Sequence, residues 1–203
     1  MDAMRSMVDQ LQSGNSLNPS AAFVAAWGQA LTDATIEPAF RALLMTLPSE
    51  DNLADAMTTA DVNAVHKVRQ HLRRTLAEAF EKELDTIATR TDANNQFSPD
   101  AASAGQRAER GAALGYLATL SGGTERALNA YHSANNRTDR MSALAALNDQ
   151  PGDARTEAIA AFHDRYAGDP LTLDKWVVLT ATAPGPDALT DIRRAMEDPT
   201  FTL

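Results

Sequence analysis

The choice of apolar residues constrains the fold of this chain more than any other feature of its sequence. It contains 39 alanines and 21 leucines but only 7 valines and 4 isoleucines. Alanine and leucine lose little conformational freedom on entering a helix, whereas β-branched residues favour strands. The composition therefore predicts an all-α protein. The one strand-like run, residues 176–183, is predicted to be helical as well, because the sequence offers it no partner strand.

Length and charge narrow the class of protein further. A chain of 203 residues with 44% hydrophobic residues can bury a substantial core. Its formal net charge of −9 makes DNA and acidic membrane surfaces poor partners. No run approaches the roughly 20 apolar residues of a membrane span, and the N-terminus has no signal-peptide pattern. We therefore expect a soluble, cytoplasmic protein that binds neither nucleic acid nor membrane.

A long amphipathic helix is the clearest element in the sequence. Apolar residues recur every three or four positions from residue 61 to residue 90, which predicts one continuous helix. Its other face carries a local basic group, which we interpret as solvated and, as the alternative, as an anion or partner site. That group consists of Lys67, Arg69, Arg73 and Arg74.

Capping residues indicate where other helices begin. Ser or Asp followed by proline is a strong start signal, and Asp directly after a turn is a weaker one. We therefore predict helix N-caps at Ser98, Asp153, Asp169 and Asp187. Together with the periodicity, these signals predict about ten or eleven short helices joined by turns.

The succession of short helices predicts the architecture. We expect an irregular α-helical superhelix, a solenoid-like stack of antiparallel helices, with a compact bundle as the alternative. The polar stretch at residues 91–96 is too short for a domain linker. Residues 1–203 are therefore predicted to form a single helical domain.

Histidines are the first candidates for metal or catalytic chemistry. His66 and His71 are five positions apart, so they do not share a helix face as a zinc pair at i and i+4 would. His163 beside Asp164 could be half of a catalytic triad, but no nucleophile motif accompanies the pair. We predict surface histidines, His132 included, with no metal ligand and no catalytic residue. The absence of cysteine also excludes a thiolate zinc site.

A second candidate segment is a corner between two helices. Asn135 and Asn136 are predicted to end one helix, since Asn tolerates the left-handed conformation of a C-cap. Thr138 or Asp139 is predicted to cap the next helix. The whole corner can be structural.

A third segment follows the cap at Asp169. Asp174 is expected in the first turn of the helix, where its charge would complement the helix dipole. Trp176, after Lys175, is expected to pack between helices.

Three motifs follow one another along the chain: Leu47-Pro48-Ser49-Glu50, Asn135-Asn136-x-Thr138-Asp139 and Asp169-Pro170-Leu171-x-x-Asp174-Lys175-Trp176. Taken together they resemble the C-terminal helical domain of bacterial aminopeptidase N, a family of zinc metallo-aminopeptidases. Their order and approximate spacing fit across nearly the whole chain. The matching residues that we assign a structural role are Pro48, Ser49, Glu50, Asn135, Asn136, Thr138, Asp139, Asp174, Lys175 and Trp176. The sequence departs from the family at Arg137, where Met is usual, and at Gly111, where Asn is usual.

The resemblance implies a role without implying any catalytic residue here. The family's H-E-x-x-H zinc motif and its G-A-M-E-N segment are absent from this sequence. The implied function is a non-catalytic cap over the active-site chamber of a zinc aminopeptidase, which limits access to short peptides with small or basic first residues. Zinc and the catalytic domain would then belong to the parent chain. The alternative is an independent helical scaffold that binds a protein partner.

The resemblance also leads us to expect that the chain is a truncated piece of that domain. The last predicted helix, at about residues 187–197, presents Leu189, Ile192 and Met196, with Phe201 after it. If later helices normally cover these side chains, their exposure predicts weak self-association.

Overall fold

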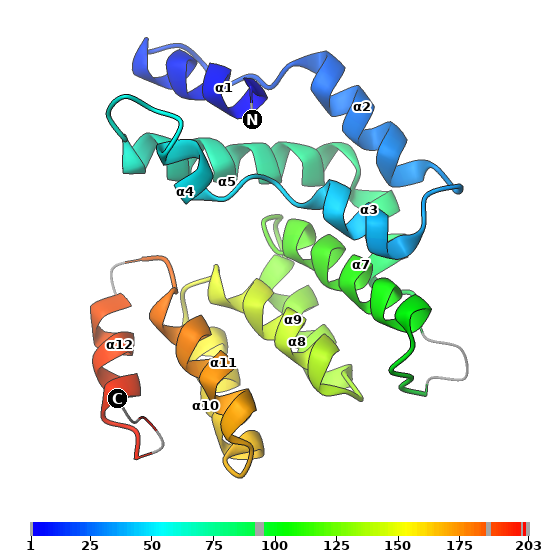
Figure 1. Ribbon diagram of the computed structural model, residues 1–203, viewed down its shortest axis with the longest axis vertical. Helices are drawn as coiled ribbons and strands as arrows, with labels where there is room; N and C mark the ends of the chain where they lie inside the picture. Colours follow the sequence, from blue (N-terminus) through cyan, green and yellow to red (C-terminus); the bar gives the residue numbers. More distant parts are fainter. Residues whose placement is uncertain (1, 92–95, 186–187, 200, 202–203) are drawn as a thin grey trace. The chain divides into compact units, whose positions relative to one another are not determined.

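The computed structural model describes residues 2–91, 96–185, 188–199 and 201. Over these residues the protein contains twelve α-helices and no strand (Figure 1). The all-α prediction is confirmed, including the strand-like run, which lies mostly in the helix Pro170–Ala181. No helix in the described part of the chain is long and apolar enough to cross a membrane.

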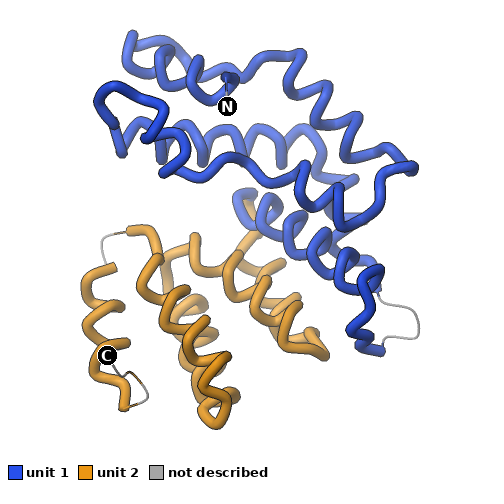
Figure 2. Tube along the Cα trace, viewed as in Figure 1, with its two compact units in different colours: residues 1–120 blue, residues 121–203 orange. Residues whose placement is uncertain are grey.

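The chain divides into two compact units, residues 1–120 and residues 121–203 (Figure 2). Unit 1 contains α1 (Asp2–Gln12), α2 (Ala21–Thr32), α3 (Pro38–Met45), α4 (Glu50–Ala54), α5 (Val62–Ala79), α6 (Glu81–Ala88) and α7 (Ala101–Leu117). Unit 2 contains α8 (Gly123–Ser133), α9 (Arg137–Asn148), α10 (Asp153–Tyr166), α11 (Pro170–Ala181) and α12 (Ala188–Met196). The single-domain prediction stays a prediction.

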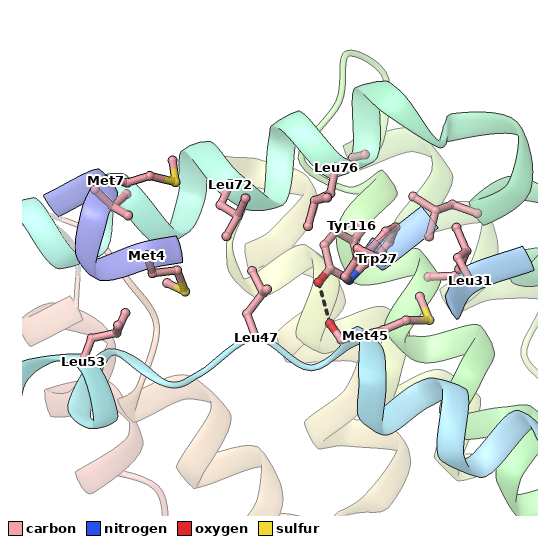
Figure 3. Packing of buried hydrophobic residues seen from close by; sticks show 14 of the residues in the cluster. Met4, Met7, Trp27, Leu31, Met45, Leu47, Leu53, Leu72, Leu76 and Tyr116 are labelled. Atoms are coloured by element: carbon pink, nitrogen blue, oxygen red, sulfur yellow. Dashed lines mark hydrogen bonds between the residues drawn. The ribbon is translucent and has the colours of Figure 1, made fainter. Parts of the chain in front are cut away.

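One hydrophobic cluster joins the helices of unit 1 (Figure 3). Helix α5 contributes a stripe of side chains with no exposed surface, at the spacing that the sequence predicts: Val65, Val68, Leu72 and Leu76. Helix α1 packs along α5 and buries two methionines there. At the other end, the ring of Trp27 lies 5.1 Å from that of Tyr116, whose hydroxyl donates to the carbonyl of Met45. The cluster thus extends from α1 to α7.

The prediction of one helix over residues 61–90 is wrong at its centre. Phe80 adopts φ −129° and ψ 31°, which separates α5 from α6. Its ring packs directly on Gly28 of α2, where a Cβ atom would lie 2.2 Å from Cζ of Phe80. A glycine is therefore needed at position 28, and the position of the Phe80 ring is fixed by tertiary packing rather than by the local sequence. This division, together with the short α4, raises the number of helices above the predicted ten or eleven.

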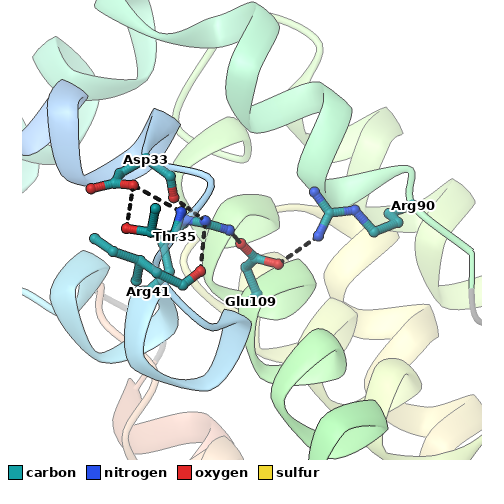
Figure 4. Close-up of polar contacts among 6 residues, drawn as sticks. Asp33, Thr35, Arg41, Arg90 and Glu109 are labelled. Atoms are coloured by element: carbon teal, nitrogen blue, oxygen red, sulfur yellow. Dashed lines mark hydrogen bonds and ion pairs between the residues drawn. The ribbon is translucent and has the colours of Figure 1, made fainter.

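A buried ion cluster ties α3 to α7 in unit 1 (Figure 4). Glu109 of α7 has no exposed surface, and its two carboxylate oxygens contact Arg41 and Arg90. Arg41 also donates to the carbonyls of Asp33 and Ile36, at 2.6 and 2.8 Å. The buried carboxylate is thus paired and hydrogen-bonded, the condition under which a buried charge is tolerated.

Unit 2 is held by a buried polar chain that reaches four helices. Arg155 of α10 donates to Asn148 of α9 at 3.1 Å and to Asp191 of α12 at 2.8 Å. Asn148 donates in turn to the carbonyl of Leu179 in α11, at 2.8 Å. Apolar contact accompanies this chain, since Leu144, Phe162 and other side chains of these helices are buried.

The predicted N-caps of α7 and α10 are each misplaced. Helix α7 is capped by Asp100, whose Oδ1 accepts from the amide of Ser103 at 2.9 Å. The predicted residue, Ser98, instead donates its hydroxyl to the Asp100 carboxylate. Gly152, with φ 138°, occupies the cap of α10, and the predicted Asp153 is its first helical residue. Asp100 has the extended backbone that is typical of an N-cap, whereas Gly152 has a positive φ that favours glycine.

The predicted cap at Asp169 is confirmed. Its carboxylate accepts from the amide of Thr172 at 3.3 Å, and Pro170 follows at the first helical position. The other predicted cap, Asp187, lies outside the described residues.

Candidate functional site

The first motif segment, residues 47–50, initiates α4 in unit 1. Ser49 is its N-cap, because the amide of Asn52 donates to Ser49 Oγ at 3.1 Å. Glu50 lies on the first turn, with its Oε1 2.9 Å from Nδ1 of His66. His66 therefore contacts a carboxylate within the fold and remains partly exposed, as predicted for a surface histidine.

The basic group on α5 is not a uniformly solvated face, and that interpretation is wrong for two of its four members. Arg69 donates from Nε to the carbonyl of Pro48 at 3.1 Å, which fixes the chain just before α4. Arg73 donates to a backbone carbonyl of α7 at 2.7 Å. Arg74 and Lys67 are exposed, as the solvated interpretation predicts. The partly buried arginines satisfy carbonyls at helix ends, which a pattern of charges along one helix does not reveal.

The second motif forms the corner between α8 and α9 in unit 2. The N-cap of α9 is Asn136, whose Oδ1 accepts from the amide of Asp139 at 2.9 Å. The predicted caps, Thr138 and Asp139, are therefore wrong: both are helical residues. The side-chain amide of Asn136 also donates to the Asp139 carboxylate at 2.7 Å and to Oδ1 of Asn135 at 3.0 Å. This reciprocal arrangement resembles a capping box.

The predicted C-cap at this corner is also misplaced. Helix α8 ends at Ser133, and Ala134 is its C-cap in an extended conformation. Asn136 is extended too, with φ −136° and ψ 161°, so it cannot be a left-handed C-cap. Asn at this corner starts a helix rather than ending one.

The third motif meets the second through Arg137. Its Nη1 lies 2.8 Å from Oδ2 of Asp169 and 2.7 Å from Oγ1 of Thr172. The Thr172 hydroxyl donates to the same carboxylate oxygen at 2.6 Å. These contacts join the first residue of α9 to the start of α11. We call Asn136, Arg137, Asp139, Asp169 and Thr172 the corner cluster.

The electrostatics of the corner cluster follow from these contacts. The hydrogen bond from the Thr172 hydroxyl is the largest influence that lowers the pKa of Asp169, followed by the Thr172 amide and the charge of Arg137. A carboxylate held in its charged form accepts hydrogen bonds and does not donate protons. The cluster therefore provides cap and ion-pair contacts.

Sequence reasoning missed two members of the corner cluster. Arg137 was noted only as a departure from the family, and Thr172 was not noted, although its side chain is buried. They lie 35 positions apart in the chain, and neither belongs to a local pattern that would indicate their contact. Only the packing of α9 beside α11 brings them together.

The rest of the third motif divides between surface and core. Trp176 is buried and packs on the ring of His163, with ring centroids 4.8 Å apart, as its predicted packing role requires. Asp174 and Lys175 are exposed. Asp174 lies beyond the first turn of α11, so its predicted dipole role is wrong.

The pair His163 and Asp164 does not form part of a triad. Nδ1 of His163 lies 3.4 Å from Oδ1 of Asp164, and Nε2 lies 2.9 Å from Oδ2 of Asp198. Both ring nitrogens therefore face carboxylates, whereas a triad histidine directs one nitrogen toward a nucleophile. His132 is exposed on α8, with its ring centroid 5.5 Å from that of Tyr131.

Comparison with known proteins agrees with the sequence motifs. Residues 1–203 match the family described as "Domain of unknown function (DUF3458_C) ARM repeats". The chain belongs to this family. Armadillo repeats stack helices into solenoids, which confirms the predicted fold class.

Curated relatives carry the name that the motifs suggest. The chain is 37% identical over 178 residues to aminopeptidase N of Caulobacter vibrioides, covering 87% of this chain. It is 30% identical over 196 residues to aminopeptidase N of Escherichia coli, covering 95% of this chain. The matches span only 21% and 22% of those relatives' own lengths. The resemblance to the helical domain of bacterial aminopeptidase N is thereby confirmed.

A solved structure shares the fold. The crystal structure of Legionella pneumophila aminopeptidase A in complex with aspartic acid aligns with a TM-score of 0.82 and 22% sequence identity. The alignment covers 98% of this chain and 25% of that one.

The residues of this family member do not fit the zinc site that aminopeptidase N implies. Over the described ranges, no group of three or more His, Asp and Glu side chains lies close enough to hold a metal ion. The donor pairs that do occur, such as His66 with Glu50, are contacts within the fold. We derive no zinc-dependent step for this chain.

Proposed function

We propose that this chain is a non-catalytic helical cap domain of a zinc metallo-aminopeptidase that removes N-terminal residues from short peptides. In this role it would cover the active-site chamber and limit access to it. Its partner would be the catalytic domain of the same parent chain, which would hold the zinc, and the parent would act in the cytoplasm. The observation that supports this proposal most is the similarity to aminopeptidase N over most of the chain, combined with the missing H-E-x-x-H motif.

The contacts of the motif residues support a non-catalytic role. Ser49, Asn136 and Asp169 cap helices, and Trp176 packs inside unit 2. Residues that cap and pack would be retained to hold a domain in shape rather than to perform chemistry. Their structural role stays a prediction, which activity measurements on variants of the parent enzyme would test.

A chimera tests the cap role. The matching segment of Caulobacter vibrioides aminopeptidase N would be replaced by this chain, and kcat/KM would be measured for an alanyl dipeptide and for a long peptide with the same first residue. We expect the chimera to keep the parent's preference for the short substrate. A variant with the segment deleted should lose that preference while still cleaving the dipeptide. Equal preference in all three proteins would contradict the proposed cap.

If the deletion variant fails to fold, addition in trans replaces it. The purified chain would be added to the separately expressed remainder of the Caulobacter enzyme, and its association would be followed by analytical ultracentrifugation. Binding that restores the preference for the short peptide supports the cap. Absence of binding, with both parts folded, would contradict it.

The alternative, an independent scaffold for a protein partner, is favoured by one surface. Three apolar side chains of α3 are exposed on one helical face, namely Phe40 (55%), Leu43 (68%) and Leu44 (39%). Adjacent exposed apolar residues are typical of a contact with another protein. In the chimera, Leu43→Glu separates the two functions: it should weaken the preference for short substrates if α3 faces the catalytic domain. An unchanged preference would favour a separate partner.

A further inference from the structure

The inference concerns the exposed face of α11, which carries the part of the third motif that the fold does not use. Four exposed side chains lie on this face, which we call the α11 face: Leu171, Asp174, Lys175 and Val178. At about 100° per residue, they fall within an arc of roughly 100° around the helix. Leu171 is 74% exposed and Val178 is 62% exposed. The helix thus presents two apolar side chains with one acidic and one basic side chain between them.

The motif residues of α11 divide by their contacts. Asp169 caps the helix and Trp176 is buried, so both act inside unit 2. The same motif supplies three residues of the α11 face: Leu171, Asp174 and Lys175. In the described part of the chain, neither of the two charged side chains forms a hydrogen bond or an ion pair. These three residues belong to the resemblance to aminopeptidase N, yet they do not hold unit 2 together.

The chemistry of the α11 face indicates the surface that it fits. Apolar side chains at positions i and i+7 serve as anchors when a helix docks its exposed face into an apolar groove. Between these anchors, Asp174 attracts a cationic group of the partner and Lys175 attracts an anionic group. Charges of opposite sign across an interface fix its register more than they add affinity. The face therefore fits an apolar protein surface that carries one basic and one acidic group.

Size and covalent connection indicate which protein this is. One face of a helix of 12 residues supplies only part of the contact area, since a stable complex of separate proteins buries roughly 1,200–2,000 Å² in total. A domain of the same chain needs less area, because the covalent link raises its effective concentration. The matched segments make up 21% and 22% of the curated relatives, so most of the length of each relative lies outside them.

We propose that the α11 face docks onto the catalytic domain of the same parent chain, with Leu171 and Val178 in apolar contact and Asp174 and Lys175 in ion pairs across the boundary. The proposal rests on the proposed function, which supplies the parent and its catalytic domain. It adds which helix of this chain faces that domain. The α11 face is a docking surface and takes no part in the chemistry.

Cysteine labelling tests the contact, because this chain has no cysteine of its own. Val178→Cys would be introduced into the isolated chain and into the chimera, and the rate of maleimide modification at position 178 would be measured by peptide mass spectrometry. We expect this rate to be about tenfold or more lower in the chimera, since a docked side chain reacts only while the two domains are apart. Leu189→Cys, at a similarly exposed position on α12, is the matched control and should be labelled at the same rate in both proteins.

Charge gives a second readout of the same contact. Lys175→Glu, combined with Val178→Cys, should raise the labelling rate in the chimera roughly two- to fivefold, which corresponds to the loss of an exposed ion pair. It should leave the rate in the isolated chain unchanged. Arg193→Glu, which changes an exposed charge on α12, should have no effect in either protein.

The outcomes separate this proposal from the proposed function. A chimera that keeps the preference for the short peptide but is labelled at position 178 as fast as the isolated chain overturns the α11 contact and leaves the cap role standing. A chimera that is protected at position 178 but has lost that preference supports the contact and contradicts the cap role. Labelling of the isolated chain that slows as its own concentration rises would show that a second copy covers the α11 face, which would also overturn the proposal.

Discussion

Both units contain a buried ion pair, but unit 1 has a core of large apolar side chains, whereas unit 2 relies more on alanine and on its buried polar contacts. The cluster of unit 1 contains Met, Leu, Val and aromatic side chains from α1 to α7. Among the described buried apolar residues of unit 2, half are alanine. Burying an alanine side chain removes little apolar area from water, so helix packing in unit 2 gains less from the hydrophobic effect than packing in unit 1. Directional contacts through Arg155 and Asn148 compensate by fixing which helices are neighbours.

The two units show that helices of similar composition can be held together mainly by large apolar side chains or, to a greater extent, by directional polar contacts. Each unit contains one of the two tryptophans, Trp27 in unit 1 and Trp176 in unit 2. The variants Trp176→Phe and Trp27→Phe therefore provide backgrounds in which urea unfolding of each unit is followed separately.

The largest effect is expected from breaking the polar chain of unit 2. Asp191→Ala leaves the buried Arg155 without its carboxylate, which should lower the free energy of unfolding by about 3–5 kcal/mol. Urea unfolding followed by Trp176 emission measures this loss. Arg194→Ala is the control, since that exposed side chain lies 3.7 Å from the same carboxylate, and it should have little effect. A loss below that of the control would mean that the stability of unit 2 does not depend on these buried polar contacts.

Unit 1 should be sensitive to volume instead. Leu72→Ala removes a side chain with no exposed surface from the cluster, at an expected cost of about 2–5 kcal/mol. Urea unfolding followed by Trp27 emission tests this. Leu72→Met, which nearly conserves volume, should cost less than about 1.5 kcal/mol. If the two substitutions cost the same, the packing of unit 1 is looser than the cluster indicates.

A smaller effect is expected at the corner of unit 2. Asn136→Ala removes the N-cap of α9 and should cost about 0.5–2 kcal/mol. Asp139→Ala removes the first-turn carboxylate and the hydrogen bond that it accepts from the Asn136 side chain, but it keeps the cap on the residue 139 amide and should cost less, about 0.3–1 kcal/mol. Thermal unfolding of the two variants ranks them. A larger loss for Asp139→Ala would indicate that Asp139 caps α9, as the sequence alone suggested.

The smallest effect is expected in the pH dependence of stability, for which we compare one N-cap residue from each unit. Hydrogen bonds from Ser98 and Ser103 lower the pKa of Asp100, and the Thr172 hydroxyl lowers the pKa of Asp169. Carboxyls with a lowered pKa in the folded state stabilise it above their unfolded pKa of about 3.9, and this stabilisation is lost as the pH falls below that value. We expect Asp100→Asn to reduce the acid sensitivity of unit 1, and Asp169→Asn that of unit 2. Melting temperatures at pH 7 and in acid, read from each tryptophan, would show whether either substitution affects the wrong unit.

Local patterns predicted the elements of this protein better than their junctions. The buried stripe of α5 appears where the apolar period places it, and Asp169 caps α11 as its Pro170 neighbour indicates. The local sequence does not indicate the break at Phe80, whose ring contacts Gly28, a residue 52 positions earlier in the chain. The caps at Asp100 and Asn136 differ from the predicted ones by a few residues, since several adjacent side chains are chemically able to cap.

The sequence by itself determined the helical class, the family motifs and the lack of the H-E-x-x-H zinc motif, because composition, spacing and short motifs are properties of neighbouring residues. Only the tertiary structure decided which charged residues meet. Glu109 with Arg41, Arg137 with Asp169, and His163 with Asp198 are pairs separated by 32 to 68 positions. A buried or partly buried charge requires a partner, but its identity depends on which helices pack together, and that is determined by the burial of apolar surface over the whole unit.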